Sequence, residues 1–210
     1  MILRIISFAG LLLINQGIFS MDIVTIEQKS FKTVLTTPAA PVTFPLSNEN
    51  LQLIAAMKNQ LHELGGVGLA APQINQPKQI IAVYIPESAA LLRDNVTIYP
   101  MHIMINPHYK PVENTSIISD FEACYSVKSK AGKVPRYQQI DVEYFDEEGN
   151  VHRSIEEGFY ARVLQHEIDH INGTLIIDRL TPDCIQGTVE EMMQLRRSQL
   201  SDEKKQSLIN

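Results

Sequence analysis

The sequence predicts an α+β domain in which short antiparallel or mixed β-sheets surround one central α-helix, with further helices near the N-terminus and the C-terminus. Three observations support this fold class. Strand-like segments dominate the middle of the chain, a helical segment that is apolar nearly all round follows them, and amphipathic or charged helical patterns stand on either side. A chain of 210 residues, of which 44% are hydrophobic, is long enough to bury one such core.

The first helical pattern follows a proline-containing breaker at residues 41–45. Residues 47–50 open it, apolar side chains recur at helical spacing between residues 51 and 61, and Gly65 and Gly66 end it. Residues 80–85 and 101–105 are expected to form short buried strands. Residues 140–145 alternate between apolar and polar side chains, which is typical of a half-exposed strand, and a turn at residues 146–150 closes it.

The central helix is expected from about residue 156 to residue 171, with Asn172 and Gly173 as its C-terminal stop. Apolar residues cover most of its circumference, which predicts that the helix is buried inside the domain. Residues 188–210 form a third helical pattern, which is charged.

The chain divides into residues 1–20, one domain at residues 21–185 and a helical tail at residues 186–210. The first part contains an apolar run at residues 5–14 after a single arginine, so it resembles a weak secretory signal that is too short to span a membrane. If translation begins at Met21, residues 1–20 are a dispensable extension.

Composition excludes two classes of protein. A formal net charge of −6 and no basic stripe before the tail argue against nonspecific binding to a phosphate backbone, because that affinity comes from clustered Lys and Arg. The two cysteines, Cys124 and Cys184, cannot build a disulfide framework.

Residues 165–170 read Gln-His-Glu-Ile-Asp-His. On a helix, His166 and His170 lie one turn apart on the same side, and Glu167 lies beside them. Two imidazoles at this spacing can bind one metal ion while the carboxylate acts as a general base, which is an arrangement typical of metal-dependent hydrolases. A chance match is expected in about one such chain in a hundred, so the motif needs support from elsewhere in the chain.

An open catalytic metal site has three protein ligands, so one ligand remains to be found. The segment after the helix has no third His and no Glu before Glu190, which argues against a zinc endopeptidase with a downstream ligand. Cys124 is the better candidate, because a thiolate binds metal, and Glu122 is placed to accept a hydrogen bond from one histidine. From this segment alone, a buried inert thiol is an equally good interpretation.

Residues 66–73, Gly-Val-Gly-Leu-Ala-Ala-Pro-Gln, predict an extended stretch whose small side chains let another group approach the backbone. Gln73 ends this stretch with an amide donor. A nucleotide-binding interpretation is weak, because the third glycine is missing and no helix is expected after Pro72.

These segments, at residues 66–73, 122–126 and 165–170, resemble in sequence and order the three signature motifs of peptide deformylases. The resemblance covers roughly residues 37–180. It implies a metal-dependent hydrolase that removes the N-formyl group from the N-terminal formyl-methionine of newly made polypeptides and releases formate.

The resemblance also implies how a metal centre is built. Cys124, His166 and His170 are expected to hold one divalent metal ion, Glu167 to be the general base, and Glu122 to support a metal-binding histidine. Family members prefer Fe²⁺, and Ni²⁺, Co²⁺ or Zn²⁺ are alternatives that one thiolate and two imidazoles also accept.

Further residues are expected to act on the substrate. Gln73 and the backbone N–H of Tyr125 are the expected donors to the developing oxyanion. Gly66, Gly68 and Arg136 are expected to contact the substrate chain, although an exposed surface charge is the favoured alternative for Arg136 alone.

The middle motif departs from the Glu-Gly-Cys-Leu-Ser that is usual in the family, since Ala123 replaces the glycine and Tyr125 replaces the leucine. We expect Ala123 to crowd tightly packed backbone and Tyr125 to add bulk beside the substrate groove. The alternative function is therefore a deformylase-like protein that binds metal or peptide without catalysis or with shifted specificity. Retention of Glu167 and Gln73 argues against loss of catalysis.

The implied partners are formylated nascent chains, with no nucleic-acid motif and no stable membrane insertion. The charged tail is most simply a solvated helix face, and a ribosome contact through the C-terminal helix is the alternative. We expect a cytoplasmic protein, because formylated chains are made in the cytoplasm and an iron–thiolate site is prone to oxidation outside it. Export is the alternative if residues 1–20 act as a signal peptide.

Overall fold

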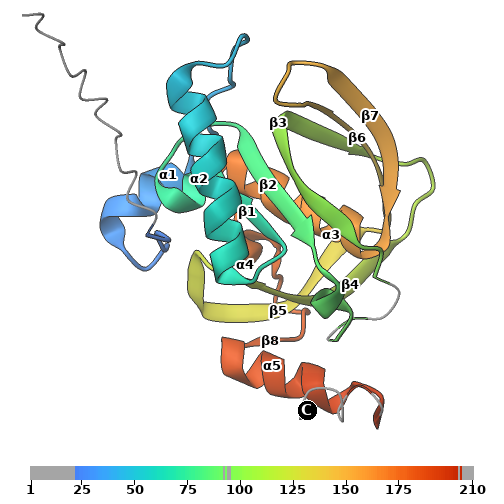
Figure 1. Cartoon of the computed structure of the whole chain (residues 1–210). Helices are drawn as coiled ribbons and strands as arrows, with labels where there is room; N and C mark the ends of the chain where they lie inside the picture. The colour runs from blue at the N-terminus through green and yellow to red at the C-terminus, as the bar shows by residue number, and fades with distance from the viewer. Residues whose placement is uncertain (1–21, 92, 94–95, 203, 205–210) are drawn as a thin grey trace, which may run out of the picture.

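The structure is a computed structural model that describes residues 22–91, 93, 96–202 and 204. The expected α+β fold class is confirmed, because the described residues form two antiparallel sheets around a buried helix (Figure 1). The larger sheet has the order β1–β2–β3–β6–β7 and the smaller sheet the order β4–β5–β8. The strands are β1 (Gly68–Ala70), β2 (Ile80–Ile85), β3 (Tyr99–Pro111), β4 (Ile117–Cys124), β5 (Val127–Tyr137), β6 (Gln139–Phe145), β7 (Val151–Glu157) and β8 (Gln186–Gly187).

The helices connect and cover these sheets. Among the described residues, no helix is long and apolar enough to cross a membrane. The α-helices are α1 (Lys32–Thr36), α2 (Asn48–Leu64), α3 (Gly158–Ile171), α4 (Ile176–Arg179) and α5 (Val189–Ser198), and the 3-10 helices are η1 (Lys29–Phe31), η2 (Ala71–Ile74) and η3 (Glu87–Leu91).

The helix α2 begins and ends where the sequence predicts. The hydroxyl of Ser47 accepts a hydrogen bond from the backbone N–H of Asn50 at 3.2 Å and so caps the N-terminus. Gly65 ends the helix in the left-handed conformation, with φ of 63°.

The strand β2 belongs to two hydrophobic cores. Ile80 and Ala82 pack with α2, whereas Ile81 and Val83 pack with α3, so the two helices lie on opposite faces of this strand (Figure 1). A strand that is buried on both faces needs no polar side chains, which explains the continuous apolar run at residues 80–85.

Three expected boundaries are wrong. The strand expected at residues 101–105 is only the half of β3 that pairs with β2; at Asn106, which has φ of 51°, the strand bulges and continues beside β6. The central helix starts at Gly158 rather than near residue 156, because Glu156 and Glu157 still pair with β6 as the end of β7. The stretch at residues 66–73 is extended only as far as Ala70.

The helix α5 packs on the smaller sheet. Met192 joins a small core with Phe121 of β4 and Ala131 of β5, and the hydroxyl of Thr188 caps the start of the helix. In Figure 1 this helix lies beside β8, at the end of the molecule away from α2. The signal-like segment at residues 1–20 lies outside the described residues, as does the last part of the tail.

Candidate metal centre and substrate cleft

The helix α3 presents His166 and His170 to the same side. Gly158, with φ of 62°, lets the chain turn from β7 directly into this helix. His170 is buried and His166 is half-buried, so both imidazoles lie inside the domain rather than on its surface.

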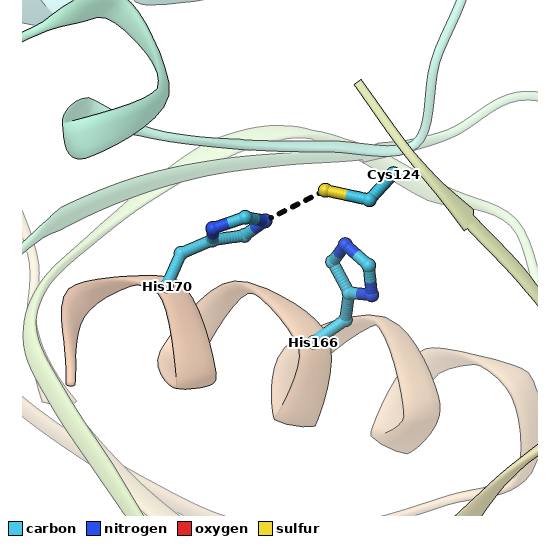
Figure 2. Close-up of side chains that lie close together, drawn as sticks. All are labelled: Cys124, His166 and His170. Carbon is cyan, nitrogen blue, oxygen red and sulfur yellow. Dashed lines mark hydrogen bonds between the residues drawn. The ribbon is translucent and has the colours of Figure 1, made fainter. Parts of the chain in front are cut away.

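Cys124 reaches the same place from the end of β4. Its sulfur lies 3.1 Å from Nε2 of His170, and the ligand atoms of Cys124, His166 and His170 all lie within 4.8 Å of one another. Figure 2 shows the three side chains converging from β4 and from two successive turns of α3. The two elements thus bring together residues that are more than 40 positions apart in the sequence.

The chemistry of this donor set fits a divalent transition metal. Nδ1 of His166 lies 2.9 Å from Oε2 of Glu122 and must donate to it, since a carboxylate only accepts, which leaves Nε2 with a free lone pair. The backbone N–H of Ser126 and the amide of Gln73 approach the sulfur of Cys124 at 3.4 and 3.8 Å. One sulfur and two imidazole nitrogens are ligands that Fe²⁺, Ni²⁺, Co²⁺ and Zn²⁺ all accept.

Glu122 is held by two buried arginines as well as by His166. Arg136 donates to both of its oxygens, at 3.0 and 2.9 Å, and Arg162 donates to Oε1 at 2.6 Å. Burial alone would raise the pKa of Glu122, but the hydrogen bond with His166 and the charge of Arg136 hold it well below its usual range. The carboxylate that orients His166 is therefore permanently charged near neutral pH.

Arg136 does not line the substrate cleft, so the expected substrate contact is wrong, and so is the alternative of a surface charge. Only 3% of this residue is exposed, and its guanidinium contacts Asp169 in addition to Glu122. Arg179 completes the pairing of Asp169, at 3.0 and 2.6 Å. Arg136 is therefore buried against two acidic side chains and is not among the residues that line the cleft.

Glu167 lies beside the three ligands and is 4% exposed. Its Oε2 has no hydrogen-bond partner among the described residues. Burial raises the pKa of Glu167 to about 7. A methyl group on Gly68 would lie 2.3 Å from Oε1, so the glycine leaves the space that this carboxylate fills.

Gln73 faces the ligands with one end of its amide. Its oxygen accepts a hydrogen bond from the backbone N–H of Ala70 at 2.8 Å, and this contact, with Pro72 in the first turn, forms the 3-10 helix η2 that the sequence does not predict. The amide nitrogen is left to point toward Cys124.

A cleft of about 680 Å³ opens beside the ligand side chains Cys124 and His166. One wall is the segment at residues 65–68, the opposite wall is the segment at residues 122–128, and Phe159 and Val163 of α3 line it beside His166 and Glu167. Gly66, Gly68 and Tyr125 also line it. The side chain of Ala123 is exposed, so the predicted crowding of the backbone at this position is wrong.

Sequence reasoning misses two residues of this region. Arg162 is buried on α3 and donates to Glu122 and to the backbone oxygen of Val134. An arginine on a helix that is otherwise apolar nearly all round signals a buried acidic partner. Val189, the first residue of α5, lines the cleft although it belongs to the charged tail, and no local pattern indicates this.

Comparisons with known proteins agree with this geometry. The family model described as polypeptide deformylase matches residues 20–185. A protein named peptide deformylase 2 from Rickettsia conorii is 37% identical over 188 residues, which cover 88% of this chain and 92% of that protein. A peptide deformylase from Halothermothrix orenii is 38% identical over 147 residues, which cover 70% and 87% of the two chains.

Solved structures are similar over most of the chain. A class I type b peptide deformylase from Acinetobacter baumannii with bound Met-Ala-Ser has a TM-score of 0.66 at 30% identity, covering 76% of this chain and 98% of that one. A peptide deformylase from Synechococcus elongatus in complex with actinonin has a TM-score of 0.65 at 27% identity, covering 90% and 91%.

Proposed function

This chain belongs to the polypeptide deformylase family, and we propose that the metal centre and the cleft described above carry out its reaction. The protein is a peptide deformylase, a hydrolase that removes the N-formyl group from newly made polypeptides. The amide bond between the formyl carbon and the methionine nitrogen is cleaved by water, and formate and a free amine are released.

Cys124, His166 and His170 would hold the divalent metal of this enzyme. When bound, such an ion acts as a Lewis acid that polarises the formyl carbonyl and makes a water molecule more acidic. The single observation that carries the assignment is the meeting of these three side chains with Glu167 at the base of the cleft. The hydrogen bond from His166 to Glu122 keeps this imidazole in one tautomer and one orientation.

Glu167 moves the protons. As a carboxylate it accepts a proton from the attacking water, and it then donates this proton to the departing methionine nitrogen. Burial raises the pKa of Glu167, so this group takes up and releases a proton near neutral pH more evenly than an exposed carboxyl group does. The amide nitrogen of Gln73 and the backbone N–H of Tyr125 would stabilise the negative charge that develops on the formyl oxygen.

Iron is the metal that the family resemblance favours, and Ni²⁺, Co²⁺ and Zn²⁺ remain compatible with the donor set. Formylated chains are made in the cytoplasm, which supports a cytoplasmic location for the protein. The alternative of ribosome contact would use α5, whose last turn contains Arg196 and Arg197.

Formate release from formyl-Met-Ala-Ser tests the assignment of roles. Protein purified without oxygen is loaded in turn with iron, nickel or zinc. We expect Glu167→Gln to lower kcat by roughly 10²–10⁴-fold, as loss of a general base does, with metal content unchanged. Cys124→Ser is expected to lose metal.

The matched control is Glu190→Gln, which alters an exposed acid on α5 and should leave turnover unchanged. Metal-loaded Glu167→Gln protein with full activity would contradict the role of Glu167. A folded, metal-loaded wild-type protein that releases no formate would favour the noncatalytic alternative.

A further inference from the structure

The side chain of Tyr125 crosses the cleft from one wall to the other. It follows Cys124 in the turn between β4 and β5, and its hydroxyl donates a hydrogen bond to the backbone oxygen of Leu64, at the end of α2, at 3.3 Å. The residue is 37% exposed and lines the cleft. A side chain from the wall at residues 122–128 is thus hydrogen-bonded to the backbone just before the wall at residues 65–68.

Gly66 makes this crossing sterically allowed. A methyl group at position 66 would lie 2.4 Å from the hydroxyl oxygen of Tyr125 and 3.0 Å from Cε2 of its ring. The phenol therefore occupies the place that a side chain on the opposite wall would fill. Only a glycine at this position leaves room for the ring without displacing it.

Both ends of this bridge are anchored. On one side, the backbone oxygen of Ser126 accepts a hydrogen bond from the backbone N–H of Ile26 at 2.9 Å, which fixes the turn that carries Tyr125. On the other side, Leu64 is the last residue of α2, and the backbone N–H of Gly65 donates to the oxygen of His62 at 3.2 Å.

The two parts of the cleft suit different parts of a formylated peptide. Phe159 and Val163, which lie one turn apart on α3, and Val189 add apolar side chains to the lining, which suit the side chain of methionine. The reacting amide has to lie beside Glu167. The part at Gly66 and Tyr125 is then left for the residues that follow the methionine.

We propose that Tyr125 is a specificity-determining residue, and that its hydrogen bond across the cleft limits the size of the side chain that follows the formyl-methionine. The proposal rests on the deformylase function given above. Leucine, which is usual in the family at this position, has no hydroxyl and cannot attach the two walls to each other. This chain should therefore discriminate against large second residues.

The test compares formyl-Met-Ala-Ser with formyl-Met-Trp-Ser. We measure the ratio of their kcat/KM values for the wild-type protein, Tyr125→Leu and Tyr125→Phe. The ratio should favour the alanine peptide in the wild-type protein and fall by about tenfold or more in Tyr125→Leu, the scale on which a pocket discriminates by size. It should fall less in Tyr125→Phe, which keeps the ring but loses the hydrogen bond. Gly66→Ala, which pushes the phenol away from Leu64, should lower the ratio as well.

Tyr144→Phe is the matched control, because it removes a hydroxyl on β6 outside the cleft and should leave the ratio unchanged. The same ratio in the wild-type protein and in Tyr125→Leu overturns the proposal. A ratio unchanged in Tyr125→Phe but lowered in Tyr125→Leu overturns the part assigned to the hydrogen bond.

Calorimetric binding of Met-Ala-Ser and Met-Trp-Ser to the zinc-loaded protein gives a second readout that needs no turnover. The ratio of dissociation constants should change among the variants as the kinetic ratio does. If no protein releases formate, the assignment of catalytic roles fails, but the binding ratio still decides the role of Tyr125.

Discussion

Replacing Gly68 by alanine should damage activity and stability through one contact. The added methyl group would lie 2.3 Å from Oε1 of Glu167, whereas ordinary contact begins at 3.4 Å, so the carboxylate has to move by about 1.1 Å, the difference between the two. A displacement of about 1 Å at a catalytic group can lower the rate by roughly 10²-fold. We therefore expect kcat/KM for formyl-Met-Ala-Ser to fall by about that factor.

Gly68→Ala should lower the stability of the protein, whereas a Gly→Ala change without a steric clash usually raises it. Gly68 lies in the strand β1 and does not have a positive φ, so alanine would ordinarily stabilise the protein by about 0.4–1 kcal/mol through the unfolded chain. Crowding against Glu167 should instead destabilise it by about 1–3 kcal/mol. Urea denaturation of the metal-free protein measures this difference.

A double-mutant cycle with Glu167→Ala isolates the contact, because the second change removes the carboxylate that the methyl group would meet. Gly68→Ala should then cost no stability. An equal loss of stability in both backgrounds would refute the reasoning, as would a Gly68→Ala protein with full activity.

Three further outcomes are expected. Arg136→Met leaves Glu122 and Asp169 buried with one partner fewer, so the free energy of unfolding in urea should fall by about 3–5 kcal/mol. A variant with unchanged stability and an altered KM would instead indicate that Arg136 contacts the substrate. Because burial raises the pKa of Glu167 and only its carboxylate accepts a proton, kcat/KM should fall about tenfold for each unit of pH below that pKa; a kcat/KM that rises as the pH falls would contradict its role as a base. Removing the metal with a chelator should lower Tm, since binding at a hundredfold excess over Kd stabilises by about 2.7 kcal/mol, and Cys124→Ser should show no such shift.

The features that sequence predicts correctly are those set by neighbouring residues. Ser47 and Gly65 mark the ends of α2 because capping and the left-handed stop need only a few adjacent residues. The placing of His166 and His170 on one face likewise follows from helical geometry alone. The contact of Cys124 with these histidines joins segments that are distant in the sequence. The sequence indicates this contact mainly through the resemblance of its three motifs to those of the family.

What the sequence does not predict depends on contacts between distant segments. Glu122 pairs with Arg136 and Arg162, which lie 14 and 40 residues away. The apolar surroundings of Arg162 on its helix signal a buried acidic partner but do not identify Glu122, and nothing local distinguishes Arg136 from a surface charge. The second half of β3 is missed because the bulge at Asn106 moves the strand to a new partner, and the apolar pattern ends there. The crowding expected at Ala123 fails because the direction of its side chain depends on the register of β4 with β5.

The position of Val189 makes the first turn of α5 part of the lining of the cleft. This residue lines the cleft, while Met192, one turn later, is packed on the smaller sheet. Any partner that moves the start of α5 therefore changes the size of the cleft and the affinity for a peptide in it. Thermodynamic linkage requires the converse, so a bound peptide must alter the affinity for that partner by the same factor.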